Sequence, residues 1–289
     1  MSTRNLQQII ESIATSDGAG VKLRRSLGRS QTVRLDPFLM LDEFSTEDAS
    51  DYIAGFPAHP HRGFETVTYM LDGHMRHEDH LGNRGELKSG GVQWMTAGRG
   101  IIHSEMPQQE SGRMRGFQLW VNLPAAEKMK PAFYRDIPSE EIPMANLADG
   151  GLVKVIAGNL VLEDQVIAGP IQGLTTDPLY LDVTLLPGGK FSQLINSRYN
   201  VFLYPYEGEV SVGPSDALRL LKAQSAGVLA AGEKIEVIAG TEGVCFILLA
   251  GRPLNEPVVQ YGPFVMNTRE EIEQAIRDYQ SGELVRAAA

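Results

Sequence analysis

Apolar residues recur along the chain in short runs that are continuous or alternate with polar residues. Glycine, proline, asparagine and aspartate separate these runs, a pattern typical of many short strands. Strands at this spacing predict a β-sandwich or a β-barrel, and the fold class is therefore all-β. The clearest runs are residues 64–71, 91–95, 116–121, 152–157, 179–185, 201–206 and 244–250.

One helix is predicted near the C-terminus. Thr268 and Glu271 have the spacing of a capping box, in which each side chain accepts a hydrogen bond from the other residue's backbone N–H. The apolar residues that follow repeat with helical periodicity, and Gly282 supplies a stop. We expect this helix to serve packing rather than chemistry.

The chain has 289 residues, which fits one large or two medium domains. Residues 125–142 carry alternating charges, two prolines and little sustained apolar periodicity, and strand-like runs resume at Leu152. We therefore expect a first domain over residues 1–130, a linker over residues 131–145, and a second domain over residues 146–289 that ends in the helix.

The charge balance argues against direct nucleic-acid binding. The chain has 26 lysines and arginines and 36 aspartates and glutamates, a net charge of −10, whereas nucleic-acid surfaces need clustered basic residues. No apolar stretch approaches the roughly 20 residues that span a bilayer, and the N-terminus lacks the pattern of a secretory signal. The single Cys245 cannot form an internal disulfide. We expect a cytoplasmic protein without membrane contacts, or a nuclear one if its source is a eukaryote.

All six histidines lie between positions 59 and 103. His59 and His61 are two residues apart, so on a strand their imidazoles point to the same face. His103 and Glu105 repeat this spacing. Two such strands side by side would offer four ligands to one ion. Imidazole and carboxylate donors suit iron, copper, nickel, zinc, manganese or cobalt, and the lack of thiolates disfavours a purely structural zinc site.

A second carboxylate competes for the fourth ligand position. Glu65 has the same strand parity as His59 and His61. Parity alone does not choose between Glu65 and Glu105, and the residue that is not a ligand would accept a hydrogen bond from a ligating imidazole.

Three further histidines lie in a polar, turn-rich segment. His74, His77 and His80 are spaced by three, and in a hairpin or loop this spacing does not align side chains. We expect them on the surface, with His77 as the first candidate for an exception.

Several longer stretches of the chain have a familiar sequence: residues 35–44, 56–69, 92–107, 118–123 and 262–268. These stretches closely resemble the pirin family of the cupin superfamily, and the resemblance spans nearly the whole chain. It implies a bicupin, with two antiparallel β-barrels of the double-stranded β-helix (jelly-roll) type joined by a short linker, and the short C-terminal helix on the second barrel.

The resemblance also implies one metal ion per chain, usually Fe(II), in the first barrel. Carried over position by position, its ligands are His59, His61, His103 and Glu105. The resemblance thus favours Glu105 over Glu65 as the fourth ligand.

The second half of the chain lacks the residues for a site of this kind. Aligning the acidic-glycine turn at Glu207 with the one at Asp72 places Leu194 and Asn196 where His59 and His61 stand. No histidine follows residue 103. We expect the second barrel to be structural or regulatory.

Relatives of this kind are similar to quercetin 2,3-dioxygenases, which implies a flavonol-like aromatic substrate and O2. The reaction opens the heterocyclic ring and releases carbon monoxide. Glu105 is then both ligand and general base, and Phe56 and Trp120 are candidates to flank the substrate. The alternative is a non-enzymatic, iron-dependent redox sensor that binds a protein partner, as a transcriptional coregulator or a modulator of a metabolic enzyme. We expect a monomer.

Overall fold

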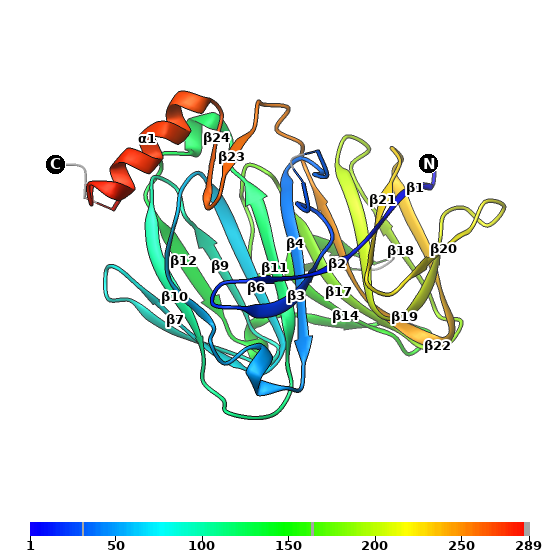
Figure 1. The fold of residues 1–289 in the computed structure, drawn as a ribbon. Helices are drawn as coiled ribbons and strands as arrows, with labels where there is room; N and C mark the ends of the chain where they lie inside the picture. The colour runs from blue at the N-terminus through cyan, green and yellow to red at the C-terminus, as the bar shows by residue number, and fades with distance from the viewer. Residues whose placement is uncertain (31, 163–164, 286–289) are drawn as a thin grey trace. The chain divides into compact units, whose positions relative to one another are not determined.

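The computed structural model describes residues 1–30, 32–162 and 165–285. Most of these residues form antiparallel strands, and the described chain contains one α-helix, α1 (Arg269–Gln280) (Figure 1). Its capping box is present. Thr268 Oγ1 accepts a hydrogen bond from the backbone N–H of Glu271 at 3.2 Å, and Glu271 Oε2 accepts one from the backbone N–H of Thr268 at 3.0 Å. The all-β fold and the C-terminal helix are confirmed.

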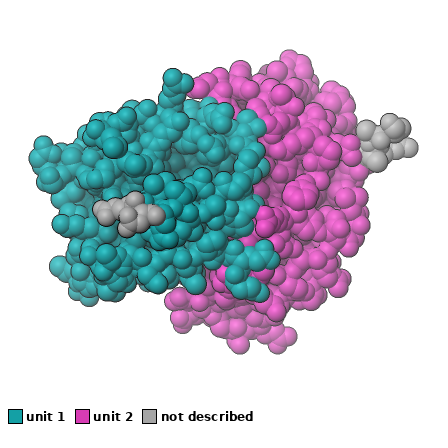
Figure 2. Space-filling view, turned by 180° about the vertical axis from the view of Figure 1, so that it is seen from behind, with its two compact units in different colours: residues 1–12, 35–37, 140–253 teal, residues 13–34, 38–139, 254–289 magenta. Residues whose placement is uncertain are grey.

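The chain forms two compact units, each built from several segments of the sequence. Figure 2 shows them in different colours. Unit 1 comprises residues 1–12, 35–37 and 140–253, and unit 2 comprises residues 13–34, 38–139 and 254–289.

The two terminal segments do not follow the expected sequential domains. β1 (Leu6–Glu11), expected in the first domain, pairs with β21 (Ser225–Leu229) in unit 1. Residues 254–289, expected on the second barrel, belong to unit 2, where Asp278 of α1 forms an ion pair with Arg62 at 2.7 Å. The expectation was wrong for these segments because strand pairing and ion pairs join residues far apart in sequence, which local composition does not record.

Unit 2 holds the histidine-rich half of the chain in two main sheets. One has the order β12-β9-β6-β11-β4-β3-β2, the other the order β5-β10-β7-β8, and β23 and β24 form a small ribbon. The strands are β2 (Ile13–Asp17), β3 (Val21–Arg25), β4 (Phe38–Thr46), β5 (Phe56–His61), β6 (Phe64–Asp72), β7 (His74–Asp79), β8 (Arg84–Lys88), β9 (Val92–Thr96), β10 (Ile101–Pro107), β11 (Met114–Asn122), β12 (Phe133–Ile137), β23 (Val259–Tyr261) and β24 (Phe264–Met266). Short 3-10 turns are η1 (Ala49–Asp51), η2 (Ala125–Glu127) and η3 (Ser139–Glu141).

The two main sheets of unit 2 share a core. Met75 and Leu87 from the four-stranded sheet pack with Phe44, Met70 and Met114 from the seven-stranded sheet. Burying apolar side chains from both inner faces in this way is what holds two packed sheets together. This arrangement agrees with the jelly-roll type of barrel expected for a cupin.

Unit 1 contains the second barrel. Its main sheet has the order β1-β21-β19-β22-β17-β14-β13, with β18 on β22 and β20 on β19, and β15 and β16 form a separate ribbon. Alternate residues of β17, such as Leu181 and Val183, are fully buried in its core. The further strands are β13 (Met144–Asn146), β14 (Leu152–Ala157), β15 (Asn159–Val161), β16 (Val166–Ala168), β17 (Leu179–Leu185), β18 (Lys190–Leu194), β19 (Asn200–Val212), β20 (Arg219–Lys222) and β22 (Lys234–Gly251).

Two local features of unit 2 place the site. β7 and β8 form the expected hairpin, whose turn contains Gly82 at φ +82°. β5 ends at His61 and β6 begins at Phe64, with Gly63 at φ +90° between them. This break redirects the chain from one sheet to the other. No helix in the described part of the chain is long and apolar enough to cross a membrane.

Candidate metal centre

The three histidines predicted as ligands converge from two neighbouring strands. β5 and β10 pair antiparallel, with His103 opposite His59 and Ile101 opposite His61. The ring centroids of His59 and His103 are 4.3 Å apart, and those of His61 and His103 are 4.9 Å apart. The structure therefore contains the side-by-side strands that the His-x-His and His-x-Glu spacings predicted.

The nitrogen atoms of this cluster fit a metal ion. One ligand nitrogen from each of His59, His61 and His103 lies within 4.8 Å of the others. Nδ1 of His61 and Nε2 of His103 are buried and have no hydrogen-bond partner among the described residues. His59 Nδ1 lies 2.8 Å from the carbonyl oxygen of Pro57, which can only accept, so Nδ1 carries the hydrogen and Nε2 is the nitrogen left to bind an ion. Buried polar atoms without partners are rare, and an ion would satisfy them.

Burial keeps two of these imidazoles neutral. Desolvation, followed by the neighbouring His59, lowers the pKa of His61 well below 6.5. Desolvation, followed by His61 and His59, lowers the pKa of His103 in the same way. Because a neutral imidazole is the form that ligates a metal, the site needs little proton release to accept one.

Glu105 is buried on β10 and lines the same cavity as His59 and His61. Thr68 on β6 donates a hydrogen bond from Oγ1 to Glu105 Oε1 at 3.0 Å. The same Oγ1 lies 2.6 Å from Oε1 of the Gln118 side chain. The carboxylate is not among the ligand atoms that lie within 4.8 Å of one another. Its role as the fourth ligand stays a prediction.

Glu65, the competing carboxylate, has other partners. Thr96 Oγ1 donates to Glu65 Oε1 at 2.7 Å, and Trp94 Nε1 donates to Glu65 Oε2 at 3.2 Å. The Lys130 ammonium lies 3.7 Å from Glu65 Oε1. The side chain is buried, and desolvation raises its pKa. These contacts give Glu65 a structural role within unit 2.

The break at Gly63 explains why parity did not separate the two glutamates. Counting by twos from His61 to Glu65 assumes one continuous strand, but a new strand begins at Phe64. On β6 the even-numbered residues face the site. The ring of Phe64 lies 5.1 Å from that of His61, and Thr68 contacts the carboxylate on β10. Glu65 points to the other face of β6.

His77 is the exception expected among the remaining histidines. It is buried, and its Nδ1 lies 3.2 Å from Nδ1 of His103. Alternation along β7 turns Met75 and His77 inward and His74 and Arg76 outward. His77 therefore lies directly behind a candidate ligand.

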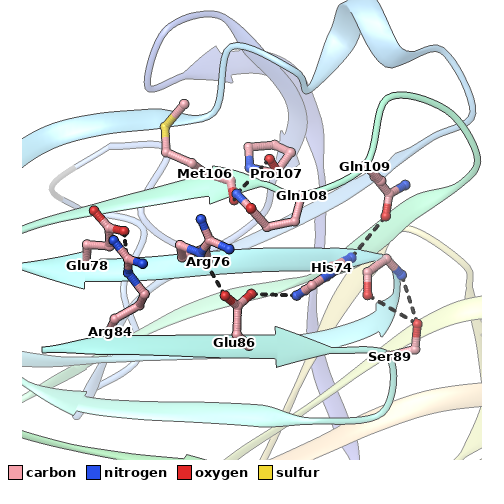
Figure 3. Close-up of polar contacts among 11 residues, drawn as sticks. His74, Arg76, Glu78, Arg84, Glu86, Ser89, Met106, Pro107, Gln108 and Gln109 are labelled. Carbon is pink, nitrogen blue, oxygen red and sulfur yellow. Dashed lines mark hydrogen bonds and ion pairs between the residues drawn. The ribbon is translucent and has the colours of Figure 1, made fainter.

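The other two histidines of this segment are half-exposed. Figure 3 shows His74 and Arg76 of β7 turned toward Glu86 of β8, with His74 Nε2 and Arg76 Nε at 2.6 and 2.7 Å from its carboxylate oxygens. His80 Nδ1 accepts a hydrogen bond from the backbone N–H of Ile102 at 3.3 Å. The surface placement predicted for His74 and His80 agrees with these contacts.

A cavity of about 700 Å³ opens beside the histidines within unit 2. Trp120 is half-buried in its wall, with its ring centroid 5.4 Å from that of His61 and 4.3 Å from that of Phe64. Phe56 lines the cavity as well, so both aromatic residues singled out in the sequence face it. The remaining wall includes Leu39, Phe44, Met75 and the polar residues Arg25, Arg34, Asp42 and Gln260.

Several residues at the cavity were missed from the sequence. Thr68 and Gln118 are polar residues in otherwise buried strands, and they stand opposite each other in the β6–β11 register. A polar residue inside an apolar run was the signal that could have found them. Arg25 and Asp42 form a bidentate pair at 2.6 and 2.7 Å, but they are 17 residues apart in sequence. Only the fold shows that they meet.

Two cupin domains, one of which carries three converging imidazoles, define a bicupin with a candidate metal centre. Residues 20–121 match the family model described as Pirin. Residues 180–285 match the model described as Pirin C-terminal cupin domain. The chain belongs to the pirin family.

Relatives support this assignment over the full length. A Pseudomonas aeruginosa protein provisionally named a quercetin 2,3-dioxygenase is 54% identical, over 93% of this chain and 94% of its own. Human pirin is 44% identical, over 97% of this chain and 93% of its own. The crystal structure of quercetin 2,3-dioxygenase from Acinetobacter baumannii is 32% identical, has a TM-score of 0.88, and covers 98% of this chain and 99% of its own.

Proposed function

We propose that the chain is an iron-dependent dioxygenase that opens the heterocyclic ring of quercetin-like flavonols with O2 and releases carbon monoxide. The observation that carries the proposal is a cluster of three imidazoles and a buried glutamate beside a cavity of about 700 Å³ with aromatic walls. Cavities of roughly 300–1,000 Å³ are typical of small-molecule sites. The relatives from P. aeruginosa and A. baumannii, both named for quercetin 2,3-dioxygenase activity, support the choice of reaction.

His59, His61, His103 and Glu105 would hold the ion. Their donor set suits Fe(II), and copper, nickel, zinc, manganese and cobalt are alternatives with compatible ligand chemistry. When bound, the metal supplies a Lewis acid that lowers the pKa of a coordinated hydroxyl group, together with open positions for reactants.

Glu105 would act as the general base. Its carboxylate lies at the cavity beside His59 and His61, where it can take the proton of a flavonol 3-hydroxyl. The hydrogen bond from Thr68 fixes the orientation of this carboxylate. A carboxylate held in this way costs little reorganisation when the proton moves.

The aromatic wall positions the substrate. Trp120 packs edge-on against His61, so a flat ring that lies against Trp120 also lies beside the proposed ligands. Phe56 and Met75 line the cavity and displace water from the reacting ring. Holding the reactants in this geometry supplies part of the rate acceleration.

Oxygen uptake tests the proposal. Iron-loaded protein is mixed with quercetin, and O2 consumption and carbon monoxide release are measured against a His103→Ala variant treated with the same iron. We expect equimolar O2 uptake and carbon monoxide release with wild-type protein and none above background with the variant. Equal, background-level rates in both would overturn the proposal.

A second role for the same centre is the one that the pirin resemblance implies, and human pirin is among the relatives of this chain. In that role the metal reports redox state, and the protein changes its affinity for a protein partner without turning over flavonols. It predicts that a partner captured from the source cell binds one oxidation state of the iron-loaded protein more tightly. Equal capture by both oxidation states would exclude it.

A further inference from the structure

We propose that Arg34 binds a negatively charged oxygen of the substrate, so that the preferred substrate is a flat aromatic molecule with an acidic substituent. The inference rests on the proposed function for the placement of substrate in this cavity, and adds a chemical class and a specificity residue. Arg34 lines the cavity that holds His59 and His61. Its one hydrogen-bond partner in the described chain is Gln260, which is not one of the proposed metal ligands.

The cavity wall contains two arginines with different surroundings. Arg25 has two carboxylate partners, with Asp42 at 2.6 Å and Asp17 at 2.8 Å, so its charge is balanced inside the protein. Arg34 forms one hydrogen bond, from Nη2 to Gln260 Oε1 at 2.5 Å, and no ion pair with any residue that the structure describes. The positive charge of Arg34 is therefore available to a ligand.

Arg34 is also partly removed from water. The residue is half-buried, its Nε is buried without an acceptor among the described residues, and burial lowers the pKa of the guanidinium. Charged groups withdrawn from water are normally paired, because desolvation without a partner is costly. A guanidinium presents planar N–H donors that match carboxylate and sulfate oxygens in pairs. An acidic substituent on the ligand would supply the missing partner.

Two segments hold this side chain at the cavity. The loop that carries Arg34 between β3 and β4 is fixed by hydrogen bonds from Gly28 N–H to Val33 O at 2.7 Å and from Val33 N–H to Ser30 O at 3.1 Å. Gln260 lies on β23 of the C-terminal segment. A donor positioned in advance in this way loses little entropy on binding, which favours a recognition role.

The test measures binding, and does not depend on turnover. Isothermal titration calorimetry of iron-loaded protein without oxygen compares three probes: quercetin, its 7-sulfate ester and its 7-methyl ether. We expect Arg34→Gln to weaken binding of the sulfate ester about tenfold or more, the loss that one charge-assisted hydrogen bond produces. Binding of the neutral methyl ether should change less than twofold, and Arg34→Lys should recover part of the sulfate affinity.

Arg84→Gln is the matched control, because it removes one positive charge from an exposed side chain paired with Glu78 outside the cavity. It should leave all three affinities unchanged. If Arg34→Gln weakens the binding of all three probes equally, or of none, Arg34 only forms its hydrogen bond with Gln260 and the inference fails. Binding of the probes by the wild-type protein would still support the proposed function. If wild-type protein binds none of the probes, both the proposed function and the inference fail.

Discussion

Nδ1 of His77 and Nδ1 of His103 lie 3.2 Å apart in the interior of unit 2. A metal held by Nε2 of His103 would leave the proton on Nδ1, so His103 would donate to His77 across this contact. The contact would then fix both the tautomer and the ring orientation of a candidate ligand. It extends the site from β5 and β10 to β7.

Replacing His77 should weaken metal binding without abolishing it. His77→Phe keeps a ring of similar size but removes the acceptor, and loss of such a partner typically lowers metal affinity about 10–100-fold. Competition with a chelator of known affinity measures the change. His74→Phe is the control, since His74 contacts Glu86 on the outer side of β7. Equal affinities in the two variants would show that His77 serves packing alone.

Removing a ligand should have a larger effect. We expect His59→Ala and His103→Ala to lose stoichiometric metal while the protein stays folded, because each change removes one of three converging nitrogens. Metal analysis of purified variants, with thermal unfolding as a check of the fold, gives the result. His80→Ala controls for loss of a histidine outside the cluster. Full metal content in both ligand variants would refute the site.

The two glutamates can be separated by the same measurement. Glu105→Gln should lower metal content sharply. Glu65→Gln should retain it, because the Glu65 carboxylate already accepts hydrogen bonds from Thr96 and Trp94. Both changes remove one negative charge and nearly conserve volume, so each controls for the other. Greater metal loss in the Glu65 variant would make Glu65 the ligand.

Strand periodicity predicted the histidine pairs because β5 contains both His59 and His61, and β10 contains both His103 and Glu105. It left Glu65 open as an alternative to Glu105 because it did not foresee that one strand ends and another starts around Gly63, which has a positive φ. Side-chain alternation cannot be counted across such a break. The pirin resemblance compares whole stretches of sequence and does not depend on parity, and it favoured Glu105, whose role as a ligand stays a prediction.

Long-range pairing was beyond reach of the sequence. His77 meets the site because β7 pairs with β10, which places it opposite Glu105. The C-terminal segment belongs to unit 2 through contacts such as that of Arg62 with Asp278, 216 residues away. Neither contact produces a recognisable pattern in the local sequence, because polar residues at these positions are expected to be exposed to solvent.

Burial of Glu65 predicts a specific dependence of stability on pH. Desolvation raises its pKa in the folded protein above the value of about 4.3 expected for an unfolded chain. As pH rises above that value the unfolded chain loses the proton first, so folding stability falls until the folded pKa is passed. Glu65→Gln removes this titration. Urea unfolding of metal-free protein from pH 4 to 7 should therefore show wild-type stability falling relative to the variant. A relative stability that rises with pH would mean that Lys130 and the hydrogen bonds outweigh desolvation.

Gly63 controls how closely the C-terminal segment packs beside His61. A Cβ atom at Gly63 would lie 2.0 Å from the carbonyl oxygen of Val265, which is backbone and cannot rotate away. Val265 is held there by its backbone hydrogen bond to Arg62 O at 3.0 Å. Gly63→Ala must therefore displace β24 or the end of β5. We expect a loss of at least about 2 kcal/mol in unfolding free energy, together with weaker metal binding.

Gly82→Ala is the control that separates the effect of the contact with Val265 from the effect of backbone strain. Gly82 has φ +82°, close to that of Gly63, but a Cβ atom there would meet nothing within 4 Å. Alanine at Gly82 should cost only the strain of a left-handed backbone, about 1 kcal/mol, and should leave metal affinity unchanged. The difference between the two variants in urea unfolding and chelator competition measures the contact with β24. If the two variants lose the same stability and keep the same metal affinity, packing of the C-terminal segment does not support the metal centre.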